Sequence, residues 1–81
     1  MKLRITERGF ERVEFHDGYG ECSIQESSAI GEQDGAYENP GSSFLWFGTR
    51  DRAHLSRALV AETIKRMQAW LDTGSLKIQG D

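Results

Sequence analysis

The first half of the chain alternates between apolar and polar side chains in three short segments. In residues 2–6, 10–17 and 20–28, apolar side chains recur at every second position over part of the segment. This pattern is typical of β-strands with one buried face. Residues 17–20, Asp-Gly-Tyr-Gly, separate the second and third segments and favour a tight turn. We therefore expect a β-hairpin whose inward side chains are Val13, Phe15, Cys22 and Ile24.

The alternation stops at residue 29. Residues 29–43 contain three glycines, the only proline and the acids Glu32, Asp34 and Glu38. A stretch of this composition and length predicts a long acidic loop over about 29–43.

A fourth strand is predicted at residues 44–49, Phe-Leu-Trp-Phe-Gly-Thr. Four large apolar side chains in succession indicate a strand that is covered on both faces. One helix covers only one face of a small sheet, so the other face needs a loop, a ligand or a second subunit.

Apolar residues recur at helical spacing between Ser56 and Gly74. Ser56 is a suitable N-cap, and Gly74 is a suitable left-handed stop after Thr73. The spacing predicts that Val60, Ile64, Met67 and Leu71 face the sheet, with polar residues on the opposite side. Glu62 and Arg66 are spaced as an i,i+4 ion pair.

These elements predict an α+β fold in one domain, residues 1–81. We expect a small antiparallel sheet of about four strands with one long C-terminal helix packed across it. Residues 75–79 predict a final short edge strand through Leu76 and Ile78. An alternative is a hairpin with a swapped helix that folds only as a dimer.

Composition narrows the classes of partner and compartment. The formal net charge is -3 with a pI near 5.3, so we do not expect direct nucleic-acid binding. The single cysteine cannot form an internal disulfide, and no stretch approaches the roughly 20 apolar residues of a membrane span, so we expect a cytoplasmic protein without membrane contact. A chain of 81 residues buries only a thin core, which favours a homo-oligomer, most simply a dimer.

The candidate chemistry is that of binding rather than catalysis. Neutral donors and acceptors follow one face of the third strand at Ser23, Gln25 and Ser27, with Ser28 next to them. They could equally be a solvated face. Trp46 is more often a core residue, but on the same face it would offer a ring for stacking.

The start of the helix offers positive charge for the same ligand. His54 and Arg57 lie beside backbone N–H groups that suit a phosphate. In contrast, the spacing of His16, Cys22 and His54 supports neither a metal site nor a Cys-His pair. We therefore expect no metal, no cofactor and no enzymatic activity.

Three motifs together resemble a family of small phage and prophage proteins of unknown function. Residues 15–28 are similar to its Phe-x-Asp, Gly and Cys-Ser-Leu-Gln-x-Ser-Ser pattern, with Ile24 in place of Leu. Residues 46–48 are similar to its Trp-Leu-Gly, and 54–60 to its His-Leu-Thr-Arg-x-x-Val, with Ser56 in place of Thr. The resemblance covers roughly residues 13–76 and implies a viral or prophage setting. It implies no reaction, because the family has no assigned activity.

Two hypotheses of function follow. The first is a phage-type, anti-defence binding protein that captures a phosphorylated or nucleotide-like ligand, such as a nucleotide immune signal, at a subunit interface. The alternative is an acidic inhibitor or adaptor that docks on a host defence or nucleic-acid-binding protein through Glu32, Asp34 and Glu38. A structural accessory protein without a ligand is a third, plainer reading.

Overall fold

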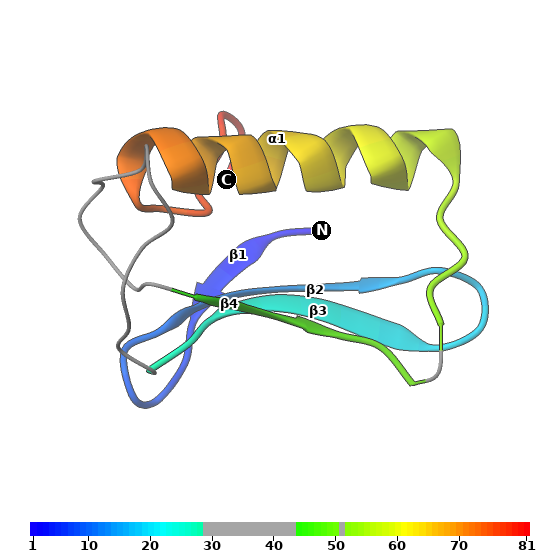
Figure 1. Cartoon of the computed structure of the whole chain (residues 1–81), viewed down its shortest axis with the longest axis horizontal. Helices are drawn as coiled ribbons and strands as arrows, with labels where there is room; N and C mark the ends of the chain where they lie inside the picture. Colours follow the sequence, from blue (N-terminus) through cyan, green and yellow to red (C-terminus); the bar gives the residue numbers. More distant parts are fainter. Residues whose placement is uncertain (29–43, 51) are drawn as a thin grey trace.

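A four-stranded antiparallel sheet and one helix make up the regular structure of the chain. The computed structural model describes residues 1–28, 44–50 and 52–81. Helix α1 lies along one face of the sheet, and no described element covers the other face (Figure 1). The sheet order is β1-β2-β3-β4, so β1 and β4 are its edges. The elements are β1 (Leu3–Ile5), β2 (Glu11–His16), β3 (Glu21–Glu26), β4 (Leu45–Gly48) and α1 (Arg57–Thr73). The predicted α+β fold is confirmed.

The predicted hairpin joins β2 to β3 and carries most of the core. Val13 pairs with Ile24 and Phe15 with Cys22, which places all four side chains on the face toward α1. All four are buried, together with Leu76. The Asp-Gly turn requires a φ of 97° at Gly18, which a residue without a Cβ adopts without strain.

The limits of α1 also follow the prediction, because they depend on local capping. The Ser56 hydroxyl oxygen accepts a hydrogen bond from the Leu59 backbone N–H at 3.2 Å. Gly74 has a φ of 82°, and its N–H donates to the Trp70 carbonyl at 2.8 Å. These two residues satisfy backbone groups that the helix itself leaves unpaired.

The rotation of α1 about its own axis corrects the prediction. Leu59, Met67 and Trp70 pack against the core, whereas Val60 and Ile64 are exposed. The residues most deeply buried along the helix are polar, Thr63 and Arg66. The apolar flank predicted to face the sheet therefore points partly to the side.

Arg66 sets this rotation by binding both ends of the chain. Its guanidinium donates to the Leu76 carbonyl at 3.2 Å, to the Met1 carbonyl at 3.1 Å and to the Asp81 carboxylate at 2.7 Å, with a second, shorter bond to Asp81. Glu62 lies 3.4 Å from the Met1 amine. The predicted Glu62–Arg66 ion pair is wrong, because each side chain has a partner outside the helix.

The expected strand at residues 75–79 is also wrong. Backbone N–H groups of this segment bond side-chain carboxylates instead of a neighbouring strand. The Leu76 N–H donates to the Glu11 carboxylate at 2.6 Å, and the Ile78 N–H donates to the Asp81 carboxylate at 2.9 Å. Leu76 is still buried, as an anchor rather than a strand residue. The predicted acidic loop, residues 29–43, lies outside the described residues. No helix among the described residues is both long and apolar enough to cross a membrane.

Candidate functional site

Asp17, the first residue of the β2–β3 turn, connects two distant parts of the chain. One carboxylate oxygen accepts hydrogen bonds from the backbone N–H groups of Tyr19 at 2.8 Å and Gly20 at 3.1 Å. The other accepts from the backbone N–H of His54 at 2.7 Å. These bonds, first that from His54 and then that from Tyr19, lower the pKa of Asp17 to about 2. At neutral pH the ionised carboxylate holds the turn against the segment that precedes α1.

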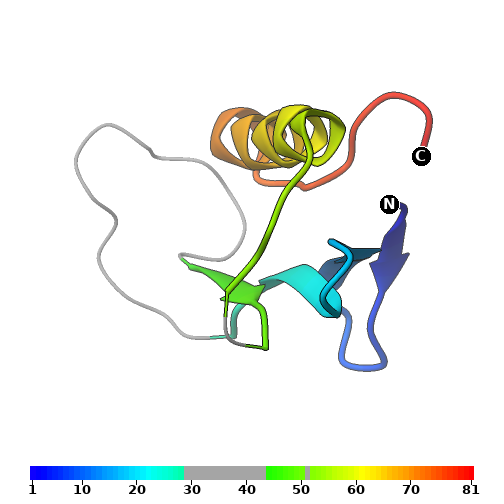
Figure 2. The ribbon, with the colours of Figure 1, turned by 90° about the vertical axis from the view of Figure 1, so that its right-hand side faces the viewer.

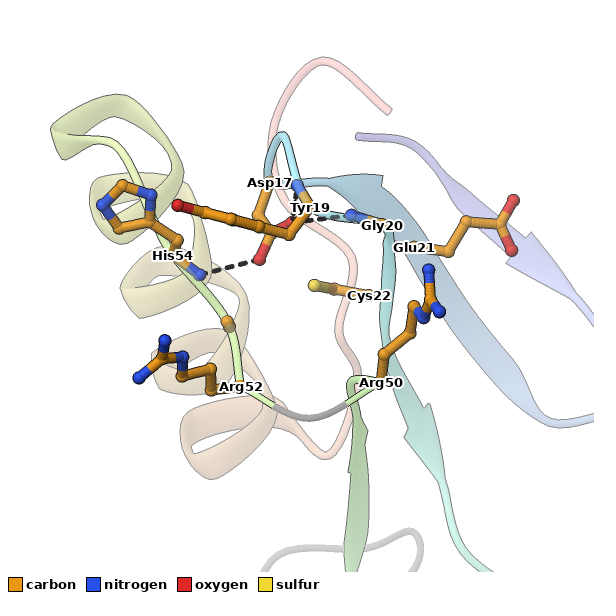
Figure 3. Close-up of a pocket in the computed structure, with 9 residues that line it drawn as sticks. Asp17, Tyr19, Gly20, Glu21, Cys22, Arg50, Arg52 and His54 are labelled. Carbon is orange, nitrogen blue, oxygen red and sulfur yellow. Dashed lines mark hydrogen bonds between the residues drawn. The ribbon is translucent and has the colours of Figure 1, made fainter.

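That segment follows β4, and we call its described residues, 49–50 and 52–54, the strap. The turn and the strap enclose a hollow of about 610 Å³, the strap hollow (Figure 3). Its lining comes from the turn, the start of β3 and the strap, so residues far apart in sequence meet there. The charged, aromatic and thiol side chains of its lining are those of Asp17, Tyr19, Glu21, Cys22, Arg50, Arg52 and His54.

Two arginines, Arg50 and Arg52, supply positive charge to the strap hollow, whose lining also includes the carboxylates of Asp17 and Glu21. Arg50 and Arg52 are exposed, and neither forms an ion pair with any residue that the structure describes. The aliphatic stem of Arg50 crosses Gly20 so closely that a Cβ there would lie 2.8 Å from the Arg50 Cδ. The oxygens of Asp17 accept three backbone N–H groups and form no ion pair with either arginine. With respect to the described residues, both guanidinium groups therefore keep donors for a ligand.

An aromatic pair borders the same hollow. The Tyr19 ring is 71% exposed, and its centroid lies 5.3 Å from that of His54, with the planes inclined by 58°. Figure 3 shows both rings on the far side of the hollow from Arg50. An exposed ring held by a neighbouring ring is a platform for a flat ligand group.

Cys22 lines the hollow without being a reactive thiol. It is buried, and burial, followed by the charge of Asp17, raises the pKa of the thiol. A protonated thiol is a poor nucleophile, which agrees with the interpretation of Cys22 as a small core residue. Among the described residues, no three His, Cys, Asp or Glu side chains form a group that could hold a metal ion.

The helix-free face of the sheet presents a second polar arrangement. Arg4, Arg12, Gln25 and Trp46 lie in one row across the four strands. Arg12 donates to the Gln25 side-chain carbonyl at 2.6 Å, so the amide NH₂ group of Gln25 remains for another partner. Trp46 beside it is 65% exposed. Gln25, Ser28 and Trp46 line part of a hollow of about 520 Å³.

Ser23 belongs to this face as well. It pairs with Gly48, and a Cβ on Gly48 would lie only 2.9 Å from the Ser23 hydroxyl oxygen. The absence of a side chain at Gly48 therefore makes room for Ser23. The strand register confirms that Ser23 and Gln25 share one sheet face, and it places Trp46, whose face the sequence left open, on that same face.

The other predicted site residues do not join that group. Ser27 is buried just beyond β3, so it does not continue the exposed row. His54 lies in the strap hollow, near the β2–β3 turn. Arg57 is the exposed first residue of α1 and lines neither of the two hollows. The structure thus separates the predicted single site into two.

Of the residues that line the strap hollow, the sequence predicted only His54 as a site residue, so the aromatic and cationic residues it missed are Tyr19, Arg50 and Arg52. A signal was present in the spacing of Arg50, Arg52 and His54, which alternate along a segment without helical periodicity. Tyr19 gave no signal, because a turn residue becomes part of a site only through what folds against it. No family model, curated protein or solved structure matches the chain, so the resemblance to phage proteins stays a prediction.

Proposed function

We propose that this chain is a small phage-type binding protein that captures a phosphorylated, nucleotide-like ligand in the strap hollow. The observation that supports this most is the pair Arg50 and Arg52, two guanidinium groups without an ion-pair partner among the described residues, in a hollow that the exposed residue Tyr19 also lines. Guanidinium groups bind phosphate oxygens in a bidentate manner, and a phenol ring stacks on a base. The hollow, about 610 Å³, has the size of a small-molecule site.

Two further parts of this proposal concern its setting. We place the ligand beside a second subunit, because β4 ends at the strap and is an open edge of the sheet among the described strands. A role against host defence, with a nucleotide immune signal as the ligand, is supported only by the phage-type resemblance of residues 15–28, 46–48 and 54–60.

The experiment is titration calorimetry and thermal shift with a panel of cyclic and linear nucleotides, the matching nucleosides, and inorganic phosphate. Arg50→Gln and Arg52→Gln should each weaken binding of the nucleotide about tenfold, equivalent to about 1.4 kcal/mol. Arg57→Gln is the matched control, because it removes the same charge from an exposed residue outside the hollow. Its effect should stay below about twofold, or about 0.4 kcal/mol.

Two results would count against this function. If no nucleotide stabilises the protein at millimolar concentration, nucleotides are excluded as the ligand class. A ligand at 100 times its Kd should add about 2.7 kcal/mol to the free energy of unfolding. Equal loss of affinity in Arg57→Gln would mean that the net charge, and not the strap hollow, attracts the ligand.

The alternative function, an acidic inhibitor or adaptor, rests on Glu32, Asp34 and Glu38, which lie outside the described residues. It stays a prediction. Capture of a basic host protein that is lost when these three acids are neutralised, with nucleotide binding absent, would favour it over the ligand-binding function.

A further inference from the structure

The apolar flank of α1 faces the side of the molecule on which β4 lies. Glu62 and Arg66 bind Met1 and Asp81, and Figure 2 shows both chain ends on one side of α1, with β4 below the other side. Val60 and Ile64 are each two residues from Glu62 or Arg66, which is about 200° around a helix. They therefore lie on the β4 side, 40% and 61% exposed.

Among the described residues, the edge of β4 below this flank has no partner strand. The Ser27 N–H donates to the Phe44 carbonyl at 3.0 Å, which sets the phase of the antiparallel ladder. Ladder bonds alternate along a strand, so Trp46 and Gly48 direct their N–H and C=O groups toward β3, and Leu45 and Phe47 direct theirs outward. Two residues of β4 thus present four main-chain groups at the edge.

Nothing in the side chains of β4 protects this edge. Natural edge strands avoid pairing through charges, proline or bulges. β1, at the other edge, carries Arg4, whereas Leu-Trp-Phe-Gly of β4 has no charged residue or proline. Phe47 is partly exposed on the helix side and Trp46 is exposed on the opposite side. Val60, Ile64 and Phe47 on the helix side and Trp46 on the opposite side are exposed apolar residues on the β4 side of the molecule, and we call these four the edge strip.

We propose that a second copy of this chain pairs with the edge strip through an antiparallel β4–β4 contact about a two-fold axis. Leu45 would pair with Phe47 of the partner subunit, and Phe47 with Leu45 of the partner subunit. All four outward groups of each chain then form hydrogen bonds. This register places Trp46 opposite Trp46 of the partner subunit at a non-hydrogen-bonded position, where cross-strand side chains are closest. On the helix side, Val60 and Ile64 of the two chains face each other.

A second copy is the partner that the edge strip fits best. The outward N–H and C=O groups belong to Leu45 and Phe47, two residues apart, so an antiparallel copy of β4 can pair with all four of them. The four side chains of the edge strip carry no charge that would select a charged partner instead. A whole large side chain has an area of about 150 to 250 Å². With the exposed fractions of Trp46, Phe47, Val60 and Ile64, the edge strip exposes roughly 450 Å². With the strand backbone and the half-buried Leu45, this approaches the roughly 600 Å² per chain of the smallest stable interfaces. We therefore expect a dimer of micromolar affinity.

This inference rests on the oligomeric part of the proposed function and specifies its interface. The strap follows β4 directly. In the antiparallel pair, the Gly48 end of one β4 lies beside the start of the other. The strap hollow of each chain would thus border its partner.

The test is sedimentation equilibrium of the full chain between about 1 and 200 µM, a range that brackets a micromolar Kd. Ile64→Lys should shift the dimer dissociation constant at least tenfold toward monomer. Ile5→Lys is a matched control, because Ile5 is exposed to 60% on the opposite edge strand, and it should dimerise like the wild type. Circular dichroism checks that both variants fold.

Hydrogen exchange supplies a readout of the register. The Phe47 amide should be protected at high concentration and lose protection on dilution, whereas the Trp46 amide, which faces β3, should stay protected. A monomeric wild type at 200 µM, equal dissociation by Ile5→Lys, or protection of Phe47 that is independent of concentration would each overturn the β4–β4 contact. If monomeric Ile64→Lys still binds the nucleotide, the ligand site does not depend on the dimer. A dimer that binds no nucleotide would leave only the interface.

Discussion

The buried ion pair between Arg66 and Asp81 offers the sharpest test of how this small fold is held together. The Arg66 side chain is 1% exposed and the Asp81 side chain 7% exposed. Asp81→Asn keeps the shape of the side chain and removes its charge, so the guanidinium remains buried with only neutral acceptors: the carbonyls of Met1 and Leu76 and the side-chain carbonyl of the new amide. The change therefore asks how much the carboxylate contributes to stability.

The structure sets the magnitude. Removing one partner of a buried ion pair costs about 3 to 5 kcal/mol, and the neutral acceptors that remain favour the lower end. We expect Asp81→Asn to lower the free energy of unfolding by about 3 kcal/mol. A domain of 81 residues has roughly 4 to 12 kcal/mol in total. The loss should lower Tm by about 15 °C.

The pH dependence gives an independent check. The Arg66 hydrogen bond, more than any other contact, lowers the pKa of Asp81 to about 2 from an ordinary value of 3.8. Because the folded pKa lies below the unfolded one, the stabilisation is complete above about pH 4 and is lost as the pH falls toward 2. Asp17 loses its stabilisation over the same range. The acid-induced loss should therefore be smaller in Asp81→Asn than in the wild type, but not absent.

Urea unfolding followed by circular dichroism at pH 7 and at pH 3 measures both effects. Asp72→Asn is the control: Asp72 is exposed on α1 and accepts only a hydrogen bond from Gln68 at 2.9 Å. Its free energy of unfolding should change by less than about 0.5 kcal/mol. If Asp81→Asn stays within about 1 kcal/mol of the wild type, well below the cost of an unpaired buried charge, the pair does not anchor α1 and our account of its rotation is refuted.

Three smaller changes test the local structure. Ser56→Ala should destabilise by about 1 kcal/mol in urea unfolding because it removes the acceptor of the Leu59 N–H, whereas exposed Ser28→Ala should have no effect; equal values would argue against the cap. Gly74→Ala should cost about 1 kcal/mol because φ is 82° there, and an unchanged Tm would contradict this. Asp17→Asn weakens the acceptor of the His54 N–H, so exchange of that amide should speed up about tenfold with the β2 amides unchanged; slow exchange at His54 would show that the strap is held by other contacts.

The sequence determined the elements whose causes are local. Alternation with a period of two located the hairpin, because Val13 and Ile24 need only a sheet with one buried face. Ser56 and Gly74 set the limits of α1, since capping depends on groups within a few residues. The register that places Gln25 beside Trp46 is not among these elements, because it depends on how β4 pairs with β3.

Only the tertiary structure decided the rotation of α1 and the composition of the strap hollow. Helical spacing favoured Val60 and Ile64 as the inner face, but Arg66 lies inward because a carboxylate and two carbonyls from the two ends of the chain satisfy its guanidinium there. The strap hollow likewise depends on a bond between Asp17 and His54, 37 residues apart. The periodicity of the sequence indicates which face of a strand or helix is apolar. It cannot report which distant polar group will satisfy a buried charge or hold a loop in place, and those long-range bonds determine the site.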